Sequence, residues 1–233
     1  MGASTVWLFD LDNTLHNASH ASFRGITERM TDYMVRELAM SQPDADALRR
    51  SYYLRYGATL LGLVRHHGVK AGHFLHDTHI LPGLEQQVHG HAHDLAVLRA
   101  LPGRKYLVTN APRHYTGRVL GVLDIGHLFD GIVTVEDMAM FGHLRPKPDA
   151  RMLRRLAAQL GVLPTQCVLV EDSLENLKAA RRVGMGTVWV QRWTRRANWG
   201  IAGSTRVTMN PVYVDLRVVG LKGLRRLEGL RAR

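Results

Sequence analysis

Two carboxylates stand two residues apart at the end of an apolar run near the start of the chain. The run is VWLF (6–9), and Asp10 and Asp12 follow it in the segment FDLDNTLH. Like charges this close repel each other, and burial at the mouth of a strand adds to the free-energy cost. The pair therefore predicts a positively charged partner, and a divalent metal ion meets that need.

Polar side chains also follow three later apolar runs. They are Thr109 and Asn110 after YLV, Glu136 and Asp137 after GIVTV, and Glu171 and Asp172 after CVLV. In open α/β sheets, ligands bind beyond the carboxyl ends of the strands. We therefore expect these side chains to meet at one edge of a sheet, together with Lys147 of the segment RPKPD.

This set of residues suits phosphoryl transfer. Asp10 and Asp172 offer the hard oxygen ligands that Mg²⁺ prefers. Lys147 and the hydroxyl of Thr109 suit the charge of a phosphate. Asp10 is then the candidate nucleophile that forms an aspartyl-phosphate. Asp12 is the candidate acid that protonates the leaving oxygen and later activates water.

The apolar pattern predicts the sheet that positions these residues. Five short runs read as buried strands, at 6–9, 106–109, 131–135, 167–170 and 187–190. Helical spacing of apolar residues separates the later runs, with Gly161 and Gly184 where helix ends are expected. Strands that alternate with helices predict an open α/β fold with a parallel sheet.

About a hundred residues separate the first two predicted strands, which is too long for one crossover. Apolar residues from Phe23 to Leu38 keep a helical spacing, and a second helix is expected from Ser41–Gln42–Pro43 to a stop at Gly68. We expect a helical insertion at 17–83, a core formed by 1–16 and 84–200, and a basic C-terminal tail at 201–233.

Four segments resemble, in order, the motifs of the haloacid-dehalogenase superfamily: FDLDNTL, TNAP, RPKPD and VEDSLENLKAARRVGM. The resemblance covers about residues 5–192 and implies a Rossmann-like core with a helical cap, and phosphatase chemistry with Mg²⁺. The dehalogenases of this superfamily lack the second acid of the first motif, so Asp12 indicates phosphate as the substrate group. One departure is Asn176, where many members carry another acid.

The resemblance also implies a role for each motif residue. The roles are nucleophile and metal ligand for Asp10, acid–base for Asp12 with its main-chain carbonyl on the metal, phosphate binding for Thr109 beside Asn110, charge neutralisation for Lys147, and metal binding for Asp172 supported by Glu171.

The predicted insertion points to a substrate class. Its segment YYLRYGATLLGL (52–63), together with NAPRHYTGRVLGVLDI (110–125), resembles the pyrimidine 5′-nucleotidase branch. This implies a nucleoside 5′-monophosphate such as UMP or CMP as substrate. Tyr56 is a candidate to stack on the base, with helix packing as the alternative, and His16 is a candidate substrate contact. A sugar-phosphate phosphatase or a phosphomutase of the same superfamily is the alternative function.

The charge distribution leaves a second class of function open. The net charge is +11, but residues 192–233 hold ten Lys/Arg against two Asp/Glu, which leaves +3 for 1–191. A nucleic-acid-binding protein with a vestigial site would use that basic tail. We favour the enzyme with a small phosphomonoester and expect neither nucleic acid nor membrane as partner. The single cysteine, Cys167, and the absence of a signal peptide predict a cytoplasmic protein.

Overall fold

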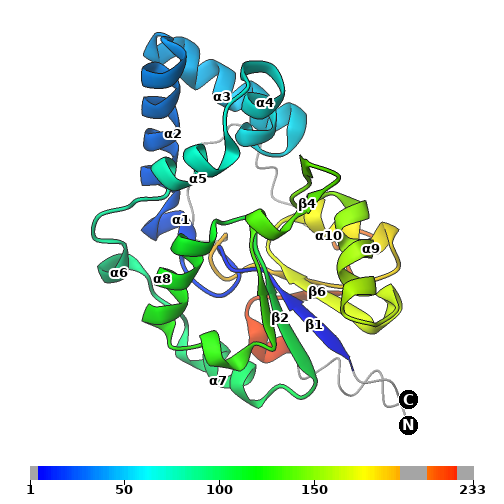
Figure 1. The fold of residues 1–233 in the computed structure, drawn as a ribbon. Coiled ribbons are helices and arrows are strands. Elements are labelled where there is room, and N and C mark those ends of the chain that lie inside the picture. The colour runs from blue at the N-terminus through cyan, green and yellow to red at the C-terminus, as the bar shows by residue number, and fades with distance from the viewer. Residues whose placement is uncertain (1–4, 195–208, 225–233) are drawn as a thin grey trace.

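A six-stranded parallel sheet forms the centre of the molecule (Figure 1). The computed structural model describes residues 5–194 and 209–224. The strands are β1 Val6–Phe9, β2 Arg104–Val108, β3 Gly131–Val133, β6 Cys167–Glu171, β7 Gly186–Val190 and β8 Leu216–Val218, in the spatial order β3-β2-β1-β6-β7-β8. A separate antiparallel pair is formed by β4 Ala139–Met140 and β5 His143–Leu144. The parallel α/β class and the five predicted strands are confirmed.

Helices cover both faces of this sheet. Along β1, Trp7 and Phe9 enter one apolar cluster, and Val6 and Leu8 enter another, because successive side chains of a strand point to opposite faces. The first cluster is closed by α6 Leu84–Gln87, α7 Ala92–Ala100 and α8 Arg113–Leu123. The second is closed by α9 Ala150–Gln159 and α10 Leu174–Arg182.

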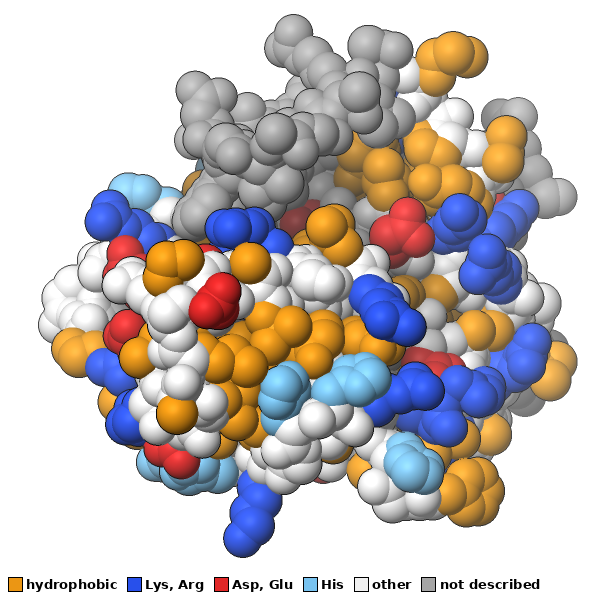
Figure 2. Space-filling model, turned by 90° about the horizontal axis from the view of Figure 1, so that it is seen from above, with side chains coloured by type: hydrophobic (Ala, Val, Ile, Leu, Met, Phe, Trp, Pro, Cys, Tyr) orange, Lys and Arg blue, Asp and Glu red, His pale blue; other side chains and the backbone are white. Residues whose placement is uncertain are grey.

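The segment between β1 and β2 folds as a group of helices with an apolar cluster of its own. After the short α1 Ala18–Ala21 come α2 Phe23–Leu38, α3 Gln42–Tyr56, α4 Thr59–His67 and α5 Ala71–Thr78. Phe74 and Leu63 are among its fully buried residues. We call α2–α5 the helical group. On the face seen from above, apolar side chains gather near the centre, with Lys and Arg side chains around them (Figure 2).

The predicted second helix of this segment is wrong in its extent. The helix starts as expected, because the Ser41 side chain accepts a hydrogen bond from the backbone N–H of Asp44 and Pro43 lies in the first turn. It ends at Gly57, whose φ of +79° favours glycine, and α4 then continues to the expected stop at Gly68. The result is two packed helices in place of one long one.

The predicted basic tail at 201–233 is also partly wrong. Residues 209–224 belong to the sheet region: β8 pairs in parallel with β7, and Val218, Leu221 and Leu224 are buried in the core. The rest of the predicted tail, 201–208 and 225–233, lies outside the described residues, as do residues 195–200. Over the described ranges, no helix is long and apolar enough to cross a membrane.

We expect Leu221→Ala to destabilise the protein by about 2–5 kcal/mol, the usual cost of truncating a buried leucine. Leu221 is completely buried, whereas the neighbouring Val219 is 52% exposed. Val219→Ala is therefore the matched control and should change stability by less than about 0.5 kcal/mol. Urea unfolding measures both variants, and equal small effects would show that this segment contributes nothing to the core.

Candidate active site

A buried lysine joins two carboxylates at the carboxyl edge of the sheet. The Nζ of Lys147 donates to Asp10 Oδ1 at 2.6 Å and to Glu171 Oε2 at 2.7 Å. Asp10 and Glu171 are neighbours because β1 and β6 pair in parallel with Phe9 opposite Val170. Lys147 arrives from the loop before α9, and its side chain is only 1% exposed.

The carboxylates of this cluster outnumber the lysine. Oxygen atoms of Asp10, Glu171 and Asp172 lie within 4.8 Å of one another. Burial and the charge of Glu171 raise the pKa of Asp10 to about 7, although Lys147 opposes the shift. Burial and the neighbouring carboxylates also raise the pKa of Asp172 well above its ordinary value. Burial disfavours the charged form of Lys147, but Asp10 and Glu171 outweigh it and raise its pKa.

A divalent cation fits this donor set. Three carboxylates facing one ammonium leave uncompensated negative charge in a buried place, and hard oxygen donors are the ligands that Mg²⁺ prefers. Among the residues that the structure describes, this is the only group of three acidic, histidine or cysteine side chains close enough to hold a metal ion. Asp10, Asp172 and Glu171, which the sequence analysis names as metal ligands with Asp12, thus lie together at the sheet edge, and their binding of a metal stays a prediction.

Thr109 and Asn110 extend the cluster from the end of β2. Thr109 is buried, and its Oγ1 accepts the backbone N–H of Ala111, which leaves the hydroxyl proton available for donation. The Asn110 side chain donates to the Lys147 carbonyl at 2.9 Å and accepts the Lys147 N–H at 3.0 Å. Both ends of the Asn110 amide are therefore occupied in holding the lysine loop, which the sequence prediction of substrate contact missed.

Asp12 is held by two side chains. Its Oδ1 accepts the hydroxyl of Tyr115 at 2.9 Å and lies 2.8 Å from His16 Nε2. Burial, and next the Asp12 charge, raise the pKa of Tyr115 well above its ordinary value, so the phenol stays protonated and can donate. The Tyr115 hydroxyl also bonds Ser22 Oγ at 2.8 Å, at the start of α2.

The predicted substrate contact of His16 does not match its position. His16 is completely buried, its Nε2 faces Asp12, and its Nδ1 has no hydrogen-bond partner within the described part of the chain. The turn after β1 brings His16, four residues after Asp12, back beside the Asp12 carboxylate. Tyr115 was not predicted as a site residue, since its spacing with Val119 is that of an ordinary core position.

The acids after β3 do not join the cluster. Both Glu136 carboxylate oxygens accept the backbone N–H of Arg113 at the start of α8, at 2.9 and 3.2 Å. Asp137 accepts the N–H and hydroxyl of Thr134 and pairs with the Arg113 guanidinium at 2.6 Å. These two acids cap local structure, so only two of the three predicted acidic strand ends converge.

Tyr56 lies in the helical group, at the end of α3. Its hydroxyl bonds His66 Nε2 at 2.6 Å, and the Arg55 guanidinium lies 5.4 Å from the centre of its ring. The following Gly57 lies close to the loop that carries Lys147. A Cβ atom placed on Gly57 would be 3.5 Å from Pro148 Cδ. The α3–α4 turn therefore lies beside the residue that follows Lys147.

Acids and a lysine at the carboxyl edge of a parallel sheet, with a helical insertion after the first strand, define a class of α/β hydrolases. The sequence profile of the haloacid dehalogenase-like hydrolases matches residues 6–184, and the chain belongs to this family. The family predicted from the four motifs is thus confirmed.

Two relatives and one solved structure illustrate the similarity. The phosphate metabolism protein 8 of Saccharomyces cerevisiae is 26% identical over 199 residues, which cover 80% of this chain and 61% of that protein. The fructose-1-phosphate phosphatase of Escherichia coli is 33% identical over 97 residues, 41% of this chain and 49% of that protein. The chain thus matches less than two thirds of either relative. A HAD phosphatase structure from Thermococcus onnurineus has a TM-score of 0.61 at 22% identity, covering 97% of this chain and 98% of that one, and supports the fold.

The buried His79, which packs against Tyr115, should make the stability of the folded protein depend on pH. Burial lowers the pKa of His79 to about 4, and its ring packs edge-on against Tyr115 at 5.8 Å. Between pH 6.5 and 4, His79 binds a proton in the unfolded chain but stays neutral in the folded protein. The contribution of His79 to stability therefore falls as the pH falls. The contribution lost is on the order of 3 kcal/mol.

Urea unfolding between pH 7 and pH 4 measures this loss. His79→Gln should show a smaller decrease in stability over that range than the wild type. His127→Gln is the matched control, because the His127 side chain is 61% exposed, and it should retain the wild-type slope. A wild-type slope in His79→Gln would contradict the assignment.

Proposed function

We propose that the protein is a Mg²⁺-dependent phosphomonoester hydrolase that acts through an aspartyl-phosphate. The observation that carries the proposal is the buried Lys147 bound to Asp10 and Glu171, with Asp172 within reach of both acids. A phosphate adds further negative charge, and this lysine and a cation together would balance it. The phosphate-related names of the two relatives support the same reaction class.

The proposed reaction has two halves. In the first, an Asp10 oxygen attacks phosphorus, and the bond between phosphorus and the ester oxygen breaks with its electron pair on the leaving oxygen. Asp12 donates the proton that the leaving oxygen requires. In the second, Asp12 takes a proton from water as that water attacks the aspartyl-phosphate, which releases inorganic phosphate and regenerates Asp10.

The remaining residues orient these two acids and the phosphate. Lys147 favours the ionised form of Asp10 against the effect of burial, and Thr109 donates its hydroxyl to a phosphate oxygen. Asn110 holds the backbone of Lys147 in place. Mg²⁺ bound by Asp10, Asp172 and the Asp12 carbonyl, with Glu171 in support, would neutralise charge on the transferring phosphoryl group.

In this proposal residues 17–83, which include the helical group, serve as a cap over the core of 1–16 and 84–200, which β8 extends. The α3–α4 turn beside Pro148 supports that placement. For the substrate we propose a nucleoside 5′-monophosphate, with a pyrimidine base preferred, on the resemblance of 52–63 and 110–125 to that branch. The aromatic and basic side chains of the helical group suit a flat ring with carbonyl oxygens.

Sugar phosphates are the second candidate substrates, and the name of the Escherichia coli relative favours them. A phosphomutase would use the same acids but would have to keep water from the aspartyl-phosphate. The alternative of a nucleic-acid-binding tail loses support over 209–224. There Arg217 bonds Gln191 Oε1 at 2.7 Å and lies over the Trp189 ring, within the sheet region.

Asp10→Asn should lower the rate of phosphate release by roughly 10⁴-fold or more, because the amide is a far weaker nucleophile than the carboxylate. Its circular dichroism spectrum should match that of the wild type. Asp32→Asn, at an exposed position of α2, is the control and should retain full activity. The assay uses nucleoside and sugar monophosphates with Mg²⁺ or with EDTA. Wild-type rates in Asp10→Asn, or full activity in EDTA, would refute the proposal.

Tyr56→Ala should raise the KM for UMP by roughly tenfold, the order of one lost stacking contact. Hydrolysis of p-nitrophenyl phosphate, which has no nucleobase, should change little. Tyr53→Ala is the control on the same helix, since Tyr53 is 58% exposed. An equal loss on both substrates would show that Tyr56 packs with Tyr52 and His66 and binds no base.

A further inference from the structure

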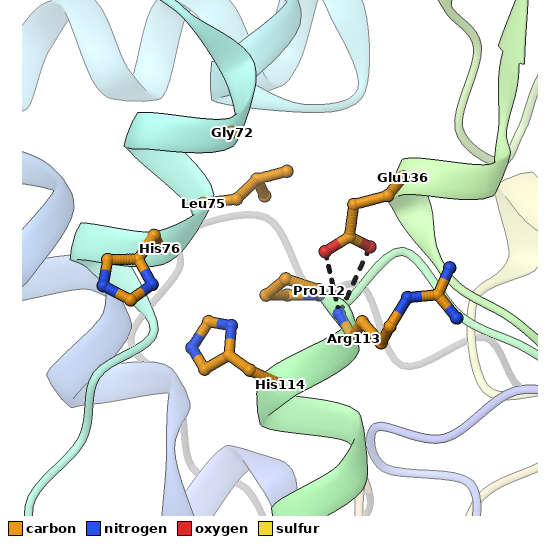
Figure 3. A pocket seen from close by; sticks show the side chains of 7 residues that line it. All are labelled: Gly72, Leu75, His76, Pro112, Arg113, His114 and Glu136. Carbon is orange, nitrogen blue, oxygen red and sulfur yellow. Dashed lines mark hydrogen bonds between the residues drawn. The ribbon is translucent and has the colours of Figure 1, made fainter.

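A hollow of about 370 Å³ lies between α5 and the start of α8 (Figure 3). Leu75 and His76 line it from α5, Pro112 and His114 from the start of α8, and Glu136 from the turn after β3. Its volume lies at the lower end of the range for small-molecule sites, which is about 300–1,000 Å³. None of these residues takes part in the reaction steps proposed above.

Chain connectivity puts this hollow beside the proposed acid. Pro112 and His114 follow Thr109 and Asn110 by only a few residues. His114 directly precedes Tyr115, whose hydroxyl donates to Asp12. At the end of α5, the His79 ring packs edge-on against the same Tyr115 at 5.8 Å, so α5 also lies beside the tyrosine that holds Asp12. Because Asp12 protonates the leaving oxygen, the leaving group must lie on this side of the phosphate.

The polar groups of the hollow suit hydroxyls. The imidazole rings of His76 and His114 line the hollow, with their centres 5.5 Å apart. Figure 3 shows both rings at the hollow, with the Glu136 carboxylate on the Arg113 backbone N–H. Imidazole nitrogens and carboxylate oxygens can each bind an –OH group.

The charge of the hollow disfavours an acidic leaving group. The Arg113 guanidinium is paired with Asp137 at 2.6 Å, so its charge does not offset that of Glu136. A substrate carboxylate placed here would face the Glu136 carboxylate, and like charges at close range repel. The hollow therefore combines hydroxyl recognition with rejection of anions.

We infer that this hollow binds the leaving group and selects a neutral, hydroxyl-rich carbon skeleton, such as a sugar or the ribose of a nucleotide, over a carboxylate-bearing one. The inference rests on the proposed phosphomonoesterase function. The His76 and His114 rings contact the leaving group, and Glu136 determines the selection against a carboxylate.

Kinetics with ribose 5-phosphate and 2-phosphoglycolate test this selection. Wild-type kcat/KM should be higher for ribose 5-phosphate. The isosteric change Glu136→Gln should raise kcat/KM for 2-phosphoglycolate about tenfold relative to ribose 5-phosphate. His114→Ala should lower kcat/KM for ribose 5-phosphate about tenfold more than for p-nitrophenyl phosphate, which carries no hydroxyl on its ring. Glu28→Gln and His127→Ala, both at exposed positions away from the hollow, are the matched controls.

A binding measurement separates this inference from the proposed function. In Asp10→Asn protein, the ring proton resonances of His76 and His114 should shift on addition of ribose 5-phosphate and not of 2-phosphoglycolate. If the wild type hydrolyses no monoester and these shifts still occur, the hollow binds the sugar phosphate as inferred, and the proposed phosphatase function is refuted. Hydrolysis with a wild-type preference for 2-phosphoglycolate, or equal effects of both variants on all substrates, would overturn the inference and leave the phosphatase intact.

Discussion

The ion pairs of Lys147 with Asp10 and Glu171 are the interaction on which the rest of the site depends. A buried ammonium is costly unless carboxylates surround it, and the buried acids are equally costly without it. Their meeting requires β1 and β6 to pair in register, so that Asp10 and Glu171 are neighbours, and requires Asn110 to hold the lysine loop. The pairing of β1 with β6, the position of the lysine loop and the balance of the buried charges therefore depend on one another.

The sequence predicts this constraint well because its signals are local. Apolar runs of four or five residues mark the strands. In a parallel sheet the carboxyl ends of all strands lie at one edge, so the residues that follow each run are expected there. The acids at the ends of β1 and β6 are predicted on that basis, whereas Lys147 comes from the segment RPKPD, which follows no predicted strand. The acids after β3 follow the same pattern but cap α8 and the turn beside it, because a strand-end carboxylate also satisfies free backbone N–H groups.

What the sequence did not predict depends on long-range packing. β8 has only three residues within a basic stretch, and nothing local distinguishes it from a solvated tail until its pairing with β7 is known. Tyr115 has the spacing of a core residue, and only the fold brings its hydroxyl to Asp12, 103 positions earlier in the chain. His16 follows the first motif and yet is buried, because the turn after β1 returns the chain to Asp12, where the two residues form a parallel bridge.

The proposed function divides binding between two parts of the chain. In that proposal the lysine, hydroxyl and carboxylates at the sheet edge bind phosphate and metal, and they make no contact that would distinguish one monoester from another. Discrimination among substrates must then come from groups beyond the sheet edge, and the structure places α5 and the α3–α4 turn there. A chain of hydrogen bonds from Ser22 through Tyr115 to Asp12 links the start of α2 to the acid. The position of the helical group and the orientation of Asp12 are therefore coupled, since a displacement of Ser22 would remove one of the two hydrogen bonds described for the Tyr115 hydroxyl.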